Sequence, residues 1–169
     1  MNLSLVSAES NLQVDGMSLE EIYSLFEPDP SLPLQITSTF TSLEKQYRQL
    51  KLALNLGDAD KKAQFSAQFR SSVAKYLKLI SRKMYVPLRK RLQIADDPNL
   101  AEFHDFEARA TETNIKIGRL LQRMDASQIA DGTVPGIEVT GVMLLLANQL
   151  KAEKSYLFPL YSDSDELAA

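Results

Sequence analysis

One carboxylate near the C-terminal end of the chain occupies a position on an otherwise apolar helical face. Glu153 lies four residues after Gln149, so the two side chains share one side of a helix, and the stretch closes at Phe158-Pro159. A carboxylate in a helical core destabilises the fold unless it is hydrogen-bonded, paired with a charge or bound to a metal. We therefore expect Glu153 to have a partner, either His104 or an arginine, or to lie at the edge of the core.

The other residue types that could do chemistry exclude most catalytic and metal-binding arrangements. His104 is the only histidine and the chain contains no cysteine, so thiolate metal sites, disulfides and cysteine nucleophiles are excluded. A transition-metal site would need carboxylates from other helices to complete His104. The sequence has no glycine-rich phosphate loop, no HExxH zinc motif and no GxSxG nucleophile motif. We expect a protein that is not an enzyme, with no catalytic residue, no bound metal and no cofactor.

A run of basic residues follows near the middle of the chain. It consists of Lys75, Lys78, Arg82, Lys83, Arg89, Lys90 and Arg91. No aromatic residues are interleaved on the same face and the net charge of the chain is −3, so we do not expect direct binding of nucleic acid. Two interpretations remain: a solvated helix face, or a surface that docks an acidic protein segment, which could be the N-terminal part of this same chain.

The two ends of the chain are acidic. Residues 1–33 form an arm with six carboxylates and no lysine or arginine, and the tail 162–169 has three more carboxylates. These ends either keep the protein soluble or dock on a basic surface. Much of the arm is expected to be disordered. A capping-box pattern at Ser18 and Glu21 nevertheless predicts one short helix over 18–27. Its apolar residues are Leu19, Ile22, Tyr23 and Phe26. Because an isolated helix this short is marginal in water, it should pack on the body or on a partner.

Apolar residues recur at helical spacing in four long segments, over about 35–55, 59–93, 98–125 and 137–158. Gly57-Asp58 separates the first two, and Asp97-Pro98 predicts the start of the third. Pro87 should kink or break the second helix, and Pro159 should end the fourth. Nothing in the sequence favours strands. We predict an all-α protein in which residues 34–161 form an up-down-up-down four-helix bundle.

The apolar stripes of these helices are the predicted core. They are Ile36, Phe40, Leu43, Tyr47, Leu50 and Leu54 in the first segment, Phe65, Phe69, Val73, Tyr76, Ile80 and Met84 in the second, and Phe103, Phe106, Ala110, Ile117, Leu120 and Met124 in the third. In the fourth, the stripe follows either Val139, Val142, Leu146 and Gln149 or Met143, Leu146 and Leu150, and both settings include Glu153.

The expected location is the cytoplasm. The first 16 residues lack the basic and apolar regions of a signal peptide. The longest apolar run, residues 142–147, is far too short to span a bilayer. We expect no membrane partner.

The fourth segment resembles the last helix of hemerythrin-like domains, in which a metal-binding histidine is followed four residues later by a glutamate, and a Leu-Phe-Pro segment closes the helix. Glu153 and residues 157–159 match that pattern, and Gln149 stands where the histidine would be. The second segment ends similarly, but its ligand positions hold Leu77 and Ser81. His104 matches the histidine of the third helix in that family. The resemblance implies a hemerythrin-like bundle without its diiron centre, with Gln149, Glu153 and His104 as remnant positions.

Three stretches resemble a metal-free family, the regulator of sigma D/AlgQ family of bacterial anti-sigma factors. They are residues 69–88 (FRSSVAKYLKLISRKMYVPL), 106–121 (FEARATETNIKIGRLL) and 146–157 (LANQLKAEKSYL). The first helix lacks the Trp- and Arg-bearing pattern of that family. The resemblance implies a non-enzymatic transcription regulator that binds a protein partner, with an RNA polymerase sigma factor as the candidate. The contact residues would be the basic run and the apolar residues of the short helix at 18–27.

Two alternatives stay open beside this regulatory function. The chain could be a helical adaptor or assembly subunit whose N-terminal arm wraps a neighbouring protein. It could also be a hemerythrin-like metal- or oxygen-binding protein, although most of the histidines that such a centre needs are missing. The sequence does not decide whether the acidic arm docks on its own bundle or on another chain, and it leaves the oligomeric state open.

Overall fold

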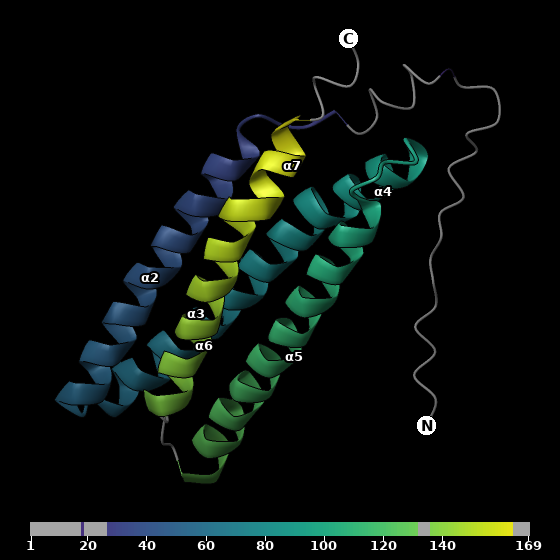
Figure 1. The fold of residues 1–169 in the computed structure, drawn as a ribbon. Helices are drawn as coiled ribbons and strands as arrows, with labels where there is room; N and C mark the ends of the chain where they lie inside the picture. The colour runs from purple at the N-terminus through teal and green to yellow at the C-terminus, as the bar shows by residue number, and fades with distance from the viewer. Residues whose placement is uncertain (1–17, 19–26, 132–135, 164–169) are drawn as a thin grey trace.

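The computed structural model describes residue 18 and residues 27–131 and 136–163, and in these parts of the chain all regular structure is helical (Figure 1). The all-α prediction is confirmed for them. The elements are α2 (Leu32–Leu56), α3 (Ala59–Ile80), η1 (Ser81–Tyr85), α4 (Val86–Ile94), α5 (Leu100–Asp131), α6 (Gly136–Ala152), η2 (Glu153–Leu157) and α7 (Phe158–Ser162). Residues 19–26, which hold the apolar residues of the predicted short helix, lie outside the described residues.

The elements join into four long helical segments. The π-helical turn η1 links α3 to α4 without interruption, and η2 links α6 to α7 in the same way. The remaining two segments are α2 and α5. α2 packs against α3 and α6, and α5 packs against the same two helices.

The helices α2 and α3 run in opposite directions. In α2 and α3 the rings of Phe40 and Tyr76 lie 5.7 Å apart, and the rings of Tyr47 and Phe69 lie 6.4 Å apart. A step forward in α2 therefore corresponds to a step backward in α3. As a result α2 begins at the end of the molecule where α3 finishes, and α7 reaches that same end (Figure 1).

A two-residue turn joins α2 to α3, as the sequence predicts. Gly57 has φ +75° and donates its backbone N–H to the carbonyl of Ala53. Glycine adopts this left-handed conformation without steric cost, so it ends the helix. Asp58 then begins α3, because its carboxylate accepts a hydrogen bond of 3.0 Å from the backbone N–H of Lys61.

The expectations drawn from the prolines need correction. Pro87 does not break its helix and Pro159 does not end the last one, because each lies in the first turn of an α-helix that follows a π-helical turn. The backbone N–H of Val86 donates to the carbonyl of Ser81, five residues back, and Phe158 does the same in η2. A proline lacks a backbone N–H, and its ring clashes with the preceding helical turn. The wider π-helical turn leaves room for the ring and keeps the neighbouring backbone hydrogen-bonded, so both segments continue past their proline.

Two helix starts also differ from the sequence-based bounds. α2 begins at Leu32, before the expected residue 35, with Pro33 in its first turn. A proline is well tolerated there, because the first backbone N–H groups of a helix have no partner within it. α5 begins at Leu100 rather than at 98, because the carboxylate of Asp97 accepts the backbone N–H of Asn99 (2.8 Å) and holds this stretch in a turn.

The predicted apolar stripes form the core. Of the first three stripes, all residues are buried except Tyr47, Leu54, Phe65 and Leu120, which are partly buried against the others. In the fourth segment, Val139, Val142, Met143, Leu146 and Leu150 are all buried, so α6 uses both of the predicted settings. None of the helices in the described ranges combines the length and apolar character needed to cross a lipid bilayer.

Two isoleucines of α5 provide a matched test of this core. Ile117 is 0% exposed and Ile115 is 50% exposed. Ile117→Ala should lower the free energy of unfolding by about 2–5 kcal/mol, because it removes buried methyl groups and leaves a cavity. Ile115→Ala should change it by less than about 0.5 kcal/mol. Urea unfolding of both variants measures the difference, and equal effects would contradict the packing described here.

Candidate functional site

Glu153, at the start of η2, lies in the core and is only 2% exposed. Its Oε1 accepts hydrogen bonds from the Tyr85 hydroxyl (2.9 Å) and from the Gln149 side-chain amide (3.1 Å). The same amide nitrogen lies 3.1 Å from the Tyr85 oxygen and also donates to it. The expectation of a partner is therefore confirmed, but the partners are a tyrosine and an amide rather than a histidine or an arginine. We call Tyr85, Gln149 and Glu153 the core triad.

His104 takes no part in this triad. Its side chain is 47% exposed, and its Nδ1 lies 3.8 Å from Glu107 Oε2, one turn further along the same helix. The sequence could not show whether Glu153 and His104 would meet, because the rotation of each helix about its own axis is fixed only by packing.

A small cavity of about 70 Å³ adjoins the triad. Residues of α3, η1, α5 and α6 line it, together with Glu153 from η2. Two buried atoms among its lining residues, Oε2 of Glu153 and the hydroxyl of Tyr76, have no hydrogen-bond partner in the described structure. A polar cavity of this volume can accommodate about two water-sized molecules.

His104, one of the five positions suggested by the hemerythrin resemblance, does not line this cavity, but the other four do. They are Leu77, Ser81, Gln149 and Glu153. Only one of them is ionisable and none is an imidazole, whereas iron centres of that type need several histidines and carboxylates. Within the described ranges, no three His, Asp or Glu residues are grouped so that they could hold a metal ion. The residues present do not fit a diiron centre.

Burial controls the ionisation of the triad. It raises the pKa of Glu153 to about 7, while the hydrogen bonds from Gln149 and Tyr85 act in the opposite direction. Burial also raises the pKa of the Tyr76 and Tyr85 hydroxyls, and the nearby Glu153 charge adds to this rise. Both tyrosines therefore stay protonated at physiological pH, and Glu153 is the group that can gain or lose a proton there.

The structure divides the predicted basic run into two sets. Lys75, Lys78, Arg82 and Lys83 are exposed on α3 and η1, and we call these four residues the basic face. Lys90 is partly buried. Arg89 forms an ion pair with Glu107, with Nη2 and Oε1 2.6 Å apart. Arg91 is 6% exposed and donates to the carbonyls of Leu160 (3.2 Å) and Tyr161 (3.0 Å). Arg89, Lys90 and Arg91 are therefore not counted in the basic face.

The basic face has no compensating acid nearby in the sequence. Residues 61–95 contain ten lysines and arginines and no aspartate or glutamate. Within the described ranges, no carboxylate lies within ion-pair distance of the four side chains of the basic face. Arg70, one helical turn and a half earlier in α3, is paired with Asp125 of α5. The charge of the basic face is therefore available to an external or terminal acidic group.

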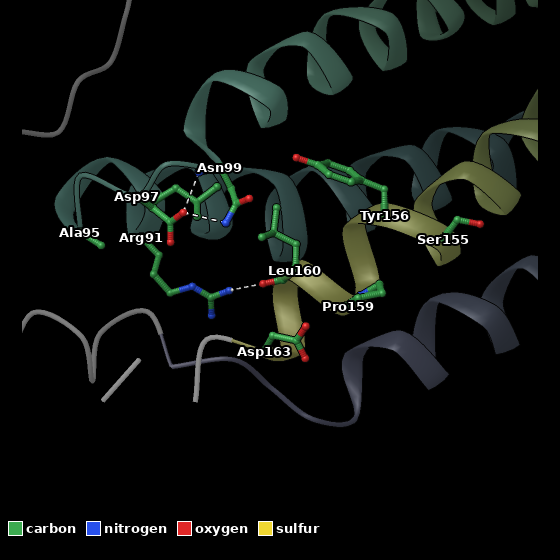
Figure 2. A pocket seen from close by; sticks show the side chains of 10 residues that line it. Arg91, Ala95, Asp97, Asn99, Ser155, Tyr156, Pro159, Leu160 and Asp163 are labelled. Carbon is green, nitrogen blue, oxygen red and sulfur yellow. Dashed lines mark hydrogen bonds between the residues drawn. The ribbon is translucent and has the colours of Figure 1, made fainter. Parts of the chain in front are cut away.

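A larger cavity of about 370 Å³ lies between the loop before α5 and the last helix (Figure 2). Tyr156 and Leu160 line one side, while Asp97 and Asn99 line the other. Its polar groups already have structural roles, because Asp97 holds the backbone of Asn99 and Arg91 caps the carbonyls at the end of α7. This cavity is therefore part of the packing at the end of the bundle.

Tyr161 links that end to the beginning of α2. Its hydroxyl accepts a hydrogen bond of 2.8 Å from the backbone N–H of Asp29, and the guanidinium carbon of Arg91 lies 5.5 Å from the centre of its ring. The arm residues Leu19, Ile22, Tyr23 and Phe26, predicted as partner contacts, are not in the described part of the chain.

Sequence reasoning missed the tyrosines of the site. The apolar spacing places Tyr76 in the core but predicts no polar contact for it, and it predicts no role for Tyr85. The only signal was the Tyr-x-Pro and Leu-Phe-Pro similarity at residues 85–87 and 157–159, which marks the two π-helical turns.

Comparison with known proteins finds no matching family model, no significantly similar curated protein and no significantly similar solved structure.

The raised pKa of Glu153 predicts a pH-dependent stability. Between the ordinary glutamate value of 4.5 and about 7, the folded state keeps a proton that the unfolded state has released. The free energy of unfolding should therefore fall as pH rises through this window, by about 3 kcal/mol in total, and change no further above it. Urea unfolding at pH 5.0 and 7.5 measures this loss.

Glu153→Gln removes the ionisable group and keeps an acceptor for Tyr85, so most of the pH dependence should disappear. Glu112→Gln, at an exposed position of α5, is the control and should keep the wild-type behaviour. A Glu153→Gln variant that loses as much stability as the wild type between the two pH values would show that Glu153 does not titrate in this window.

The buried guanidinium of Arg91 should contribute to stability. Arg91→Met keeps most of the apolar volume but removes both hydrogen bonds to the end of α7, so unfolding should become easier by about 1.5–3 kcal/mol. Arg82→Met, on the basic face, should change stability by less than about 0.5 kcal/mol. Thermal unfolding compares them, and equal midpoints would argue against the capping role of Arg91.

Proposed function

We propose that this chain is a non-enzymatic regulatory protein that binds an acidic surface of a protein partner through its basic face. The observation that carries this proposal is the division of the basic run: three of its members are wholly or partly buried, and the four exposed members have no carboxylate partner in the described structure. Exposed charges arranged in this way speed association and select the partner, more than they add affinity.

The fold we propose is an up-down-up-down four-helix bundle of the hemerythrin-like type. The antiparallel neighbours support it, as does the position of Leu77, Ser81, Gln149 and Glu153 around one cavity. The core triad replaces a metal centre by hydrogen bonds, which is consistent with a bundle used as a rigid scaffold. This arrangement favours the regulatory alternative over a metal- or oxygen-binding protein.

An anti-sigma-like transcription regulator is the specific form that we propose, with an RNA polymerase sigma factor as the partner. Three stretches of the sequence that resemble the regulator of sigma D/AlgQ family support this form. The first of them, residues 69–88, contains the whole basic face.

Affinity capture tests the function without assuming the partner. The tagged full chain should recover a protein partner from the native cell, and raising the NaCl concentration from about 50 to 300 mM should weaken the complex, since exposed ion pairs are screened. The primary sigma factor, purified separately, should bind the chain directly. Failure of that direct binding would exclude the sigma-factor form, while capture of another acidic partner would keep the general one.

A matched pair of variants tests the surface. Lys75, Lys78 and Arg82 have the same i, i+3, i+7 spacing as Lys116, Arg119 and Arg123 on α5, and all six are exposed. Changing the first three to Gln should weaken partner binding about tenfold, because each lost exposed ion pair costs up to about 1 kcal/mol. The α5 triple variant should bind like the wild type. Equal effects of the two triple variants would refute a specific role of the basic face.

A further inference from the structure

The described chain begins its continuous course near Lys83, at one end of the basic face. α2 and α3 are antiparallel, so the start of α2 lies next to the end of α3, where Lys83 is found. The backbone of Asp29 is held there by the hydroxyl of Tyr161. Hydrogen bonds from Ser31 keep the pKa of Asp29 below its usual range, and the charge of Lys83 acts in the same direction, which places Lys83 within electrostatic reach of the arm.

The segment that follows outward from Asp29 has the opposite charge. Residues 1–26 contain Glu9, Asp15, Glu20 and Glu21 and no lysine or arginine. Glu21 is eight residues from Asp29, and an extended chain of eight residues spans about 26 Å. The basic face from Lys75 to Lys83 spans about 12 Å of helix. The acidic residues can therefore reach all four basic side chains without any change in the body.

The neighbouring helices do not already supply this negative charge, because no described carboxylate of α2 or α5 lies within ion-pair distance of the basic face. Glu44, the one acidic residue of α2, lines a cavity on the side of α2 that faces α6. Asp60 and Asp58 lie at the opposite end of α3 from Lys83. An acidic segment docked on the basic face would thus meet four side chains that form no ion pair in the described structure.

We propose that residues 1–26, the outer part of the acidic arm, dock on the basic face of their own chain and compete there with an acidic partner. The inference rests on the proposed function of that face and adds its regulation. Tethering favours the arm of the same chain over a second copy, because a short flexible linker gives an effective concentration in the millimolar range. A partner must then displace the arm, so changes in the charge of the arm would tune partner binding.

Carbodiimide cross-linking of the full chain tests docking independently of any partner. The reagent joins carboxylates to lysine amines at near-contact distance. In a mixture of unlabelled and ¹⁵N-labelled chains, mass spectrometry should find links from Glu20 or Glu21 to Lys75, Lys78 or Lys83, with both halves from the same isotope. These links should disappear in about 1 M NaCl, where screening is complete within a few ångströms.

Exposed lysines elsewhere provide the control. Lys45 on α2 and Lys116 on α5 are exposed and should form at least tenfold fewer links to the arm. Equal linkage to all exposed lysines would overturn specific docking. Links of mixed isotope would overturn intrachain docking and assign the face to a contact between two copies.

A second measurement tests competition. The full chain with Glu9→Gln, Asp15→Asn, Glu20→Gln and Glu21→Gln should bind poly-L-glutamate about tenfold more tightly than the wild type, because the competing arm has lost its charge. Unchanged affinity would overturn the competition. If poly-L-glutamate binds neither chain, the proposed binding of acidic partners fails, whereas the cross-links still decide whether the arm docks.

Discussion

The hydrogen bond from Tyr85 to Glu153 joins the two places where the long helices depart from α geometry. Tyr85 closes η1 and Glu153 opens η2, and each of these turns precedes a proline that the helix must pass. Because the wider turns accommodate the prolines, α4 and α7 continue the bundle to its end. The buried Arg91, the Tyr161 contact to Asp29 and the cavity next to Tyr156 all depend on that continuation.

Much of the fold was predictable from apolar spacing alone. The stripes at three- and four-residue steps correctly predicted the core of α2, α3 and α5, and Gly57-Asp58 correctly predicted the turn between the first two helices. The paths beyond Pro87 and Pro159 were not predictable, because proline patterns report a lost hydrogen bond and not the turn type that compensates for it. The buried face of α6 was not predictable either, because its apolar residues occupy more than one face of the helix.

The site was less predictable than the fold. The sequence indicated that Glu153 needs a partner, but the rotation of one helix against another decides which side chain it meets. No spacing in the sequence marks Tyr85 as that partner. The basic run shows the same difficulty. Its charges lie within 17 residues of sequence, yet Arg91 donates to carbonyls at the end of α7 and Lys78 is exposed to solvent, because a helix separates successive residues by 100°.

The link between Asp29 and Tyr161 joins residues that are 132 positions apart in the chain. Closing a loop of that length costs more conformational entropy than closing the short turn between α2 and α3. Tyr161 is buried and belongs to α7, the last part of the continuous segment formed by α6, η2 and α7. The link therefore couples the start of α2 to the last helical turn of the described chain, and fraying of that turn also frees the backbone before α2.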